Sequence, residues 1–291
     1  MHISKRKTKL KRKNTLKRKN TKKRKSNKSK SIISILSYNI SWESMSGTVK
    51  NWSLCNNNID KTNPKHVSVC VNNVSSVFDD NNNLDFVTLQ EASDYKKLII
   101  QSSRLKNMIY EKHKSGLDMM VTFWDKKYKL QDKIIGEFEE GRPWMATIFN
   151  SNNNSNNNSN NSNNSKICLV NVHMGHYDTE EQIKMMDKMM QEINQSINKN
   201  NKNLQNKKKF RYIISGDFNY DIKKFGGSRN YFTLDNTNFY YNKKHILTCC
   251  INRRKHNDHV IDSLETPIDI IIPKVNYMAS DHKPILVEVK K

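Results

Sequence analysis

The stretch Ile213-Ile214-Ser215-Gly216-Asp217-Phe218-Asn219 changes from apolar to polar character at a single glycine. The run from Arg211 to Ser215 is typical of a buried strand, in which successive side chains point to opposite faces. Asp217 and Asn219 are two residues apart, so they are expected on the same side, just past the end of the strand. A functional site can be presented in this way, but Gly-Asp and Asn-Tyr pairs also form ordinary turns. The stretch alone leaves both interpretations open.

Other apolar runs also end in polar side chains. Ile32 to Ile40 is predicted to be a strand with Asn39 near its end, and Lys166 to His173 is predicted to end in histidine. In the run from Leu84 to Glu91, the glutamate is expected on the face of Leu89, where it is costly to bury unless it is paired or bound to a metal. The polar residues expected at strand ends are Asn39, Glu91, His173, Asp217, Asn219, Asp258 or Asp269, Asp281 and His282.

The residue types in this set indicate metal-assisted chemistry at a phosphate. Oxygen atoms of Asn, Asp and Glu suit a hard cation such as Mg²⁺, which keeps part of its shell for water and substrate phosphate. Two histidines, each oriented by a carboxylate, suit proton transfer or charge stabilisation. The ordered set therefore favours a functional site, whereas each member alone is compatible with a turn.

The remaining sequence predicts strands and helices in alternation. Helical spacing of apolar residues indicates helices at Lys65–Phe78, at Tyr95–Tyr110, and from a capping box at Asp178 and Glu181 to Ile197. Further strands are predicted at Gly116–Trp124, Arg142–Phe149, Ile246–Ile251, Asp258–Ser263, Pro267–Ile272 and Ile285–Val289. Gly136–Gly141 is interpreted as an acidic turn. This order predicts a sheet flanked by helices.

Positive charge is concentrated at the N-terminus. Residues 1–30 contain 16 of the 51 Lys and Arg and no Asp or Glu, so the remainder carries about +7 of the net charge of +23. A segment of this composition cannot bury enough apolar surface to fold, and residues 1–31 are predicted to be a disordered Lys/Arg-rich tail. Like charges repel unless an anion is present, which favours contact with nucleic acid, or a nuclear-localisation signal, over a tail with no partner.

Residues 32–291 are predicted to form one domain of the 291-residue chain, interrupted at 150–165 by an insert of only Asn and Ser. The five cysteines are odd in number and form no CxxC pair, which indicates reduced thiols in an intracellular compartment. No stretch approaches the ~20 apolar residues of a membrane helix, and no signal peptide is recognised. A soluble protein is therefore expected.

The ordered motifs resemble the endonuclease/exonuclease/phosphatase superfamily, which has the DNase I-like fold. They are SYNI (37–40), LQEA (89–92), GRPWMATIF (141–149), NVHM (171–174), SGDFN (215–219), DHVIDS (258–263) and SDHKP (280–284). The resemblance implies an α/β (α+β) fold, a four-layer sandwich of two mixed β-sheets flanked by helices, with the site where strand ends of both sheets converge. It also implies metal-dependent hydrolysis of a phosphodiester or phosphomonoester by water, with Mg²⁺ as the cofactor and Mn²⁺ as a substitute.

The resemblance further implies ligands for the metal and the substrate. Three residues would hold the cation: Glu91 as the main ligand, with Asn39 and Asp281 close by. Asp217 would orient or deprotonate the attacking water. Asn219 would hold the substrate phosphate, and Arg142, at the head of its strand, resembles an arginine on the phosphate side.

Two histidines complete the implied site. His282 would act as a general base or electrostatic stabiliser held by an aspartate, and His173 would stabilise or protonate the leaving group. Asp258 resembles the aspartate partner of His282 more closely than Asp269, which also begins an apolar run. Asp118 resembles the acidic residue that orients the first histidine, although an Asp after Gly-Leu is also an ordinary strand start.

A second cluster offers a different metal site. Its members are His245, Cys249, Cys250, His256 and His259. Cysteine and histidine clusters bind Zn²⁺, but adjacent cysteines lack the usual spacing and would point to opposite faces of a strand. Buried thiols are therefore preferred to a structural zinc site, with His256 and His259 near the mouth of the phosphate site.

These observations leave three functions open. The preferred one is an intracellular Mg²⁺-dependent nuclease or nucleic-acid phosphodiesterase, with the tail as a route to the nucleus or to sites of nucleic-acid metabolism. The same residues support a phosphatase or phosphodiesterase of phospholipids or inositol phosphates. A catalytically inactive nucleic-acid-binding protein is disfavoured, because a scaffold has no need of the catalytic set. No protein partner is indicated, and a monomer is assumed.

Overall fold

The computed structural model describes the chain in several segments, which are residues 32–41, 66–81, 83–150, 166–200, 210–244, 246–249, 255–267, 269–273 and 280–291. The predicted N-terminal tail (1–31) lies outside these residues. So does the Asn/Ser insert apart from Asn150, which ends a strand. His245 and Cys250 of the second metal cluster also lie outside them.

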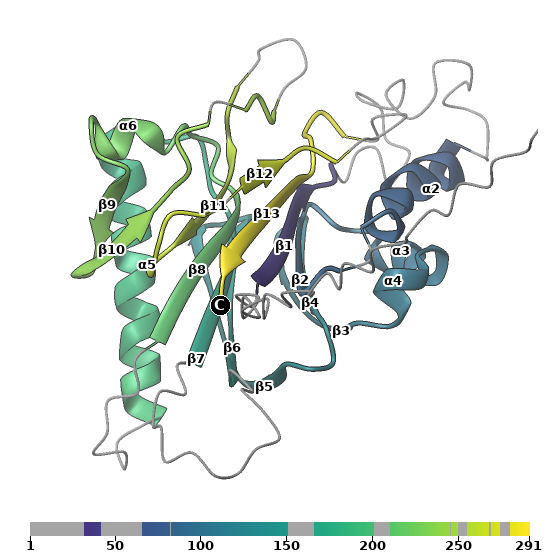
Figure 1. The fold of residues 1–291 in the computed structure, drawn as a ribbon, viewed down its shortest axis with the longest axis horizontal. Helices are drawn as coiled ribbons and strands as arrows, with labels where there is room; N and C mark the ends of the chain where they lie inside the picture. Colours follow the sequence, from purple (N-terminus) through teal and green to yellow (C-terminus); the bar gives the residue numbers. More distant parts are fainter. Residues whose placement is uncertain are drawn as a thin grey trace, which may run out of the picture. The chain divides into compact units, whose positions relative to one another are not determined.

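Two β-sheets form the centre of the fold (Figure 1). The first has the order β12 (Asp269–Ile271), β13 (Ile285–Lys290), β1 (Ile32–Asn39), β2 (Phe86–Gln90), β4 (Asp118–Trp124) and β3 (Ile109–Ser115). The second has the order β5 (Lys129–Glu139), β6 (Arg142–Asn150), β7 (Lys166–His173), β8 (Phe210–Asp217), β11 (Asp258–Asp262), β10 (Thr237–Tyr240) and β9 (Tyr231–Leu234). Each sheet is mixed, because β1 and β2 are parallel, β7 and β8 are parallel, and the other pairs are antiparallel.

Helices cover the outer face of each sheet (Figure 1). The first sheet packs against α2 (His66–Asp79), α3 (Tyr95–Gln101) and α4 (Ser103–Lys106), and the second against α5 (Thr179–Asn200) and α6 (Lys223–Gly226). A third apolar core, with members such as Ile35 of β1 and Ile213 of β8, lies between the two sheets. The predicted four-layer sandwich is confirmed.

Helix α5 begins where the capping pattern predicts. The Asp178 side chain accepts a hydrogen bond from the backbone N–H of Glu181 at 2.9 Å, which satisfies one of the free donors of the first turn. Met186, Met190 and Ile193 are buried against the second sheet. The methionines are therefore part of the core, as expected from their spacing.

The faces that the two sheets turn toward each other change from apolar to polar along the strands. Alternation places Ile213, Ser215 and Asp217 on the inner face of β8, with the carboxylate at the end. The Thr88 and Ser215 hydroxyls, one from each sheet, lie 2.8 Å apart in the middle of this gradient. Beyond them the inner face carries the charged residues of the candidate site.

A buried amide ties the two sheets together just below those charges. Asn171 of β7 accepts a hydrogen bond from Gln90 Nε2 at 2.7 Å and donates to the carbonyl oxygens of Leu89 at 3.2 Å and Val121 at 3.1 Å. All of these partners belong to the first sheet, whereas Asn171 belongs to the second. The pairing of polar groups therefore sets how the two sheets are aligned.

Three of the secondary-structure predictions are wrong. The predicted helix at Tyr95–Tyr110 is two short helices followed by the start of β3. The predicted turn at Gly136–Gly141 lies mostly within β5, an eleven-residue strand with a turn only at 140–141. Ile246–Cys249, the described part of a predicted strand, forms only isolated bridges at Cys249.

The cysteines differ in state. Cys168 is a free, buried thiol, and burial raises its pKa to about 12. Cys70 and Cys249 are disulfide-bonded, so the expectation of reduced thiols is wrong for these two.

None of the helices in the described part of the chain combines the length and the apolar character needed to cross a bilayer.

Gly216 is required by the backbone at the end of β8. Its φ is +152°, and a Cβ added there would lie 2.0 Å from the carbonyl oxygen of Val172. We expect Gly216→Ala to lower the free energy of unfolding by about 3 kcal/mol or more, because the neighbouring backbone cannot move aside. Urea unfolding would measure the free energy of unfolding of this variant.

Gly227→Ala is the control. Gly227 also has a positive φ, of +55°, but an added Cβ would have nothing within 4 Å, so this substitution should cost about 1 kcal/mol. Equal losses in the two variants would contradict the steric argument.

Candidate active site

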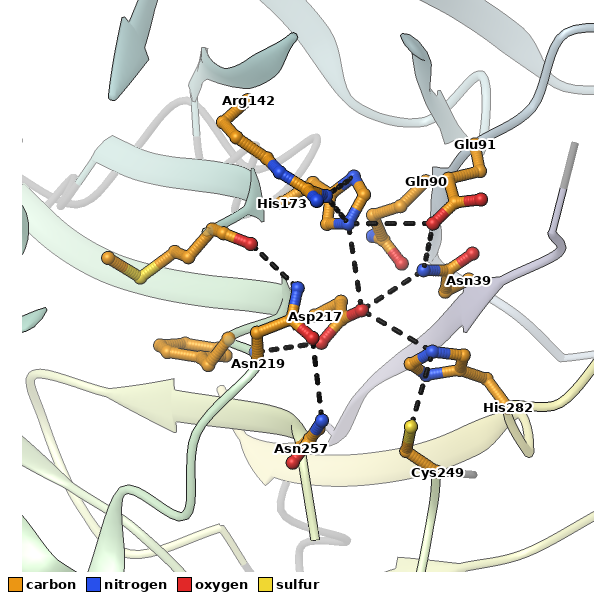
Figure 2. A network of polar contacts seen from close by, with 12 residues as sticks. Asn39, Gln90, Glu91, Arg142, His173, Asp217, Asn219, Cys249, Asn257 and His282 are labelled. Carbon is orange, nitrogen blue, oxygen red and sulfur yellow. Dashed lines mark hydrogen bonds and ion pairs between the residues drawn. The ribbon is translucent and has the colours of Figure 1, made fainter. Parts of the chain in front are cut away.

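Asp217 occupies the centre of the polar network (Figure 2). Its Oδ2 accepts a hydrogen bond from Asn39 Nδ2 at 3.0 Å and lies 3.5 Å from His282 Nε2 and 3.7 Å from His173 Nε2. Its Oδ1 accepts the backbone N–H of Asn219 at 2.8 Å. Burial alone would raise the pKa of Asp217, but the positive charges of the two histidines lower it overall. Asp217 is therefore an ionised carboxylate held between two imidazoles.

His173 lies at the end of β7, next to Asp217 at the end of β8. Its Nδ1 lies 2.6 Å from Asp118 Oδ2, and its Nε2 lies 3.5 Å from Glu91 Oε1. Burial acts to lower the pKa of His173, but the hydrogen bond and charge of Asp118, with the other carboxylates, raise it overall. The family resemblance implied that Asp118 orients His173, and the structure brings the two side chains into contact.

Arg142 lies on the other side of the same histidine. Its Nη1 is 2.6 Å from His173 Nε2, a distance that is a hydrogen bond only while Nε2 carries no proton. Protonation of His173 must therefore release the guanidinium. The structure thus places Arg142 at the head of β6, in contact with His173 (Figure 2).

His282 is held by Asp258. The distances from His282 Nδ1 to the two carboxylate oxygens are 2.9 Å and 3.1 Å. Burial opposes the charged form, but Asp258 and Asp217 raise the pKa of His282 to about 10. Burial raises the pKa of Asp258 to about 6, so at neutral pH the proton of the pair resides on the imidazole.

The register of β11 explains why Asp258 is the partner and Asp269 is not. Asp258 pairs with Asp217 across the antiparallel β8–β11 ladder, which brings it to the same strand end. Asp269 begins β12 at the edge of the first sheet, where its half-exposed carboxylate lies 3.6 Å from Lys244 Nζ. Asp258, the candidate that the family resemblance favoured, is therefore the one that contacts His282, and Asp269 lies elsewhere.

Glu91 reaches the site by leaving the strand conformation. Its φ is +51°, so the alternation that puts Leu89 against the helices no longer applies, and the predicted shared face is wrong. Glu91 Oε1 accepts a hydrogen bond from Asn39 Nδ2 at 3.0 Å, and the Glu91 backbone N–H donates to Asp118 Oδ1 at 3.0 Å. One amide thus orients two carboxylates, because Asn39 Nδ2 also donates to Asp217.

Asn219 also has a positive φ, of +50°. Its Nδ2 donates to the carbonyl oxygen of Met174 at 2.7 Å, and its Oδ1 lies 3.5 Å from Asn257 Nδ2 (Figure 2). The second N–H of this amide is the group that could contact a phosphate. Asp281 is partly buried beside His282, and its negative charge helps to raise the pKa of that histidine.

The donor set fits a divalent cation. Five carboxylates gather here, Glu91, Asp118, Asp217, Asp258 and Asp281, and they outnumber the positive groups of the two histidines and the arginine. The Glu91 side chain is 22% exposed whereas that of Asp217 is 1% exposed, so Glu91 is the carboxylate that a hydrated ion can reach. Asp217, Asp258 and His282 also place one donor atom each within 4.8 Å of the others, and His282 would have to lose a proton before it bound a cation.

The second cluster, which the sequence disfavoured as a zinc site, lies only partly within the described residues. Among the described residues, Cys249 lies near His282, with Sγ 3.4 Å from Nε2, whereas His256 and His259 group with Asp221. His245 and Cys250 lie outside the described residues.

Sequence reasoning missed several supporting residues. They are Gln90 and Asn171 between the sheets, Thr248 and Ser280 behind Asp258 and His282, and Asn257 beside Asn219. Alternation could have found Gln90 and Asn171, because each lies on the inner face of its strand near the polar end. Thr248 carried no such signal, because it precedes a bridge rather than a strand.

His259 predicts a pH dependence of stability. Its Nε2 lies 3.0 Å from the carbonyl oxygens of Tyr220 and His256, and burial lowers its pKa from 6.5 to about 4. Between pH 6.5 and 4 the unfolded imidazole takes up a proton that the folded protein does not, so stability should fall there by up to about 3 kcal/mol. Urea unfolding at pH 7 and pH 4.5 should show a smaller loss in His259→Asn than in the unsubstituted protein. Equal losses would mean that His259 does not titrate in this way.

No protein-family model matches the sequence. The chain is 30% identical over 271 residues to the uncharacterized protein L684 of Acanthamoeba polyphaga mimivirus. The matched region covers 88% of this chain and 50% of that relative. This chain thus spans about half the length of that curated relative.

Solved structures show the class of fold. The human Nocturnin catalytic domain with a bound sulfate anion has a TM-score of 0.55 at 15% identity, over 88% of this chain and 93% of that one. TDP2 of D. rerio, complexed with a single strand DNA product, has a TM-score of 0.54 at 14% identity, over 89% and 98%. An endonuclease/exonuclease/phosphatase family protein of Bacteroides thetaiotaomicron has a TM-score of 0.53 at 15% identity, over 89% and 97%.

The chain therefore has the same fold as these proteins, the DNase I-like fold. The fold predicted from the ordered motifs is confirmed.

Proposed function

We propose that the chain is a Mg²⁺-dependent phosphodiester hydrolase that acts on nucleic acid. The observation that carries this proposal is the pair of histidine–aspartate units, His173 with Asp118 and His282 with Asp258, which face each other across Asp217. Such an arrangement offers a proton acceptor and proton donors on opposite sides of one bound phosphate.

Asp217 is the group that would orient and deprotonate the attacking water. Its lowered pKa keeps it ionised at neutral pH, and Asn39 fixes the position of its Oδ2. Neutralisation by two flanking imidazoles weakens it as a base, so positioning of the water is the larger part of its role. Asp217 would not need to move in order to act, because the Asn219 backbone N–H already holds its Oδ1.

The two histidines would act on the charge of the phosphate. His282, protonated through its contact with Asp258, would stabilise negative charge as it develops on the phosphate oxygens. His173 would give its proton to the leaving oxygen, and Asp118 would stabilise its charged form. Before that transfer, protonated His173 cannot accept a hydrogen bond from Arg142, so the guanidinium would contact the phosphate, and the Asn219 amide would be a second contact.

Glu91 would be the principal ligand of the cation, with Asp281 and the free lone pair of Asn39 Oδ1 nearby. A bound Mg²⁺ would supply neutralisation of phosphate charge without a proton transfer. The Asn39 contact restricts the Glu91 carboxylate to one orientation, which is the contribution of this chain to the geometry of the ligand.

Nucleic acid is the proposed substrate because of charge. The tail of residues 1–30 carries sixteen Lys and Arg, and the remainder of the chain is also net positive. Two proteins of the same fold support this choice, one with a bound sulfate anion and one with a single strand DNA product. An intracellular location, with the tail as a nuclear-localisation signal, is part of the same proposal.

A hydrolysis assay over a mixed panel tests the proposal. The panel contains plasmid DNA, single-stranded DNA, RNA, an abasic duplex, inositol phosphates and phospholipids, each with Mg²⁺ and with EDTA. Cleavage of a nucleic acid that EDTA abolishes is the expected result. Turnover only of a lipid or inositol phosphate would overturn the choice of substrate, and nucleic-acid binding without turnover of any substrate would overturn hydrolysis itself.

A further inference from the structure

A pocket of about 440 Å³ opens beside the candidate active site. Asn219 and Asn257, whose amides face each other 3.5 Å apart, belong both to its wall and to the polar network around Asp217 (Figure 2). The pocket continues from there to the segment after β7 and to the start of α6. It is thus contiguous with the place where the scissile phosphate would bind, but none of the proposed catalytic histidines or carboxylates lines it.

The rim of this pocket is positively charged. Lys224 of α6 and Lys255, which precedes β11, both line it and are exposed, and His176 is a further lining residue. The pKa of His176 is lowered, first by partial burial and then by the positive charges of Arg142 and Lys255, so these groups lie close enough to interact. Such a rim attracts an anion.

Aromatic rings form the other part of the wall. Tyr177 and Tyr220 both line the pocket. The Tyr220 ring stacks on Phe225 at a centroid distance of 5.2 Å, and Lys224 Nζ lies 5.1 Å from the Tyr220 centroid. Tyrosine rings beside lysines are the combination that holds the base and the phosphate of one nucleotide.

Two lining residues, Asp221 and His256, also form a group of metal-binding type with His259, which does not line the pocket. The three residues place one donor atom each within 4.8 Å of the others. Two facts disfavour a cation. Asp221 already lies 3.7 Å from His256 Nδ1 and accepts the backbone N–H of Lys223 at 3.2 Å, and the positive charge of Lys223 helps to lower the pKa of His259. The local surplus of lysines therefore fits an anionic ligand better.

We propose that the pocket lined by Lys224, Lys255 and Tyr220 binds the nucleotide next to the scissile phosphate and holds its phosphate group. This inference rests on the proposed function and adds to it a second phosphate subsite. A substrate with two phosphates one nucleotide apart would fill both positions. A substrate with only the scissile phosphate would leave the lysines unused.

Matched substrates and variants test the proposal. The substrates are thymidine dinucleotides with no terminal phosphate, with a 5′ phosphate or with a 3′ phosphate. The variants are Lys224→Ala/Lys255→Ala and, as a control of equal charge change, Lys96→Ala/Lys106→Ala, which removes exposed lysines of α3 and α4. Hydrolysis is measured with Mg²⁺, and equilibrium binding is measured with EDTA, where no turnover is needed.

One terminal phosphate should raise kcat/KM and binding of the unsubstituted protein about tenfold, the effect of one charge-assisted contact. The pocket variant should lose this gain, and the control variant should keep it. If both variants lost the gain equally, or if neither terminal phosphate raised kcat/KM or binding, the proposed phosphate subsite would be overturned. A gain in binding without hydrolysis would support the pocket and overturn the proposed function. Stronger lysine-dependent binding of an inositol bisphosphate than of any dinucleotide would overturn the assignment to a nucleotide.

Discussion

Replacing His282 by glutamine is expected to lower kcat about 1,000-fold, with a much smaller change in KM. The physical reason is that Asp258 and Asp217 keep the imidazole protonated, with a pKa of about 10, so it carries a full positive charge at neutral pH. Glutamine retains a hydrogen-bond donor but no charge. The loss should therefore appear in the transition state, where negative charge on the phosphate is greatest.

Asp258→Asn provides the matched comparison. It leaves His282 in place but removes the carboxylate that holds Nδ1, so kcat should fall by a smaller factor, and the loss should grow as the pH rises through neutrality. Steady-state kinetics from pH 6 to pH 9 would measure both variants, with circular dichroism to verify that each is folded. A normal kcat in His282→Gln would show that this histidine is not part of the chemistry.

Replacing Glu91 by glutamine is the second change with a large expected effect. Removal of a direct ligand should weaken Mg²⁺ binding at least about 100-fold, since loss of a supporting contact alone costs 10–100-fold. Activity at low Mg²⁺ should disappear and return in part at high Mg²⁺. Isothermal titration with Mn²⁺ would report the affinity independently of turnover.

Glu111→Gln is the control for this prediction. Glu111 is a carboxylate of the edge strand β3, where it lies 2.7 Å from Lys133 Nζ and outside the polar network. The same neutralisation there should leave metal affinity and activity unchanged. If Glu91→Gln bound Mn²⁺ as tightly as the unsubstituted protein, the principal ligand would have to be another carboxylate.

The central strands were predictable because they are buried on both faces. The β6, β7 and β8 segments have near-continuous apolar runs, which differ clearly from the loops around them. The edge strands β3 and β5 were missed for the opposite reason. Their residues alternate between exposed and half-buried, with many charged side chains, so the sequence resembles a solvated segment.

The members of the candidate site were easier to identify than their geometry. Asp217 and His173 follow from apolar runs that end in polar residues, whereas the conformation of Glu91 depends on a positive φ that no pattern indicates. The preference for Asp258 over Asp269 came only from the family resemblance, because both residues begin short apolar runs. The register of β11 against β8 gives the physical reason for that preference.

The route of the chain through the first sheet has a consequence for synthesis on the ribosome. The site joins Asn39 to His282, and β1, which carries Asn39, lies between β2 and β13. A nascent chain cannot complete this sheet until β13 has left the exit tunnel, although most of the second sheet already exists by then. Any activity of the site should therefore begin only after β13 has left the tunnel, and fragments that lack Ile285–Lys290 should be inactive.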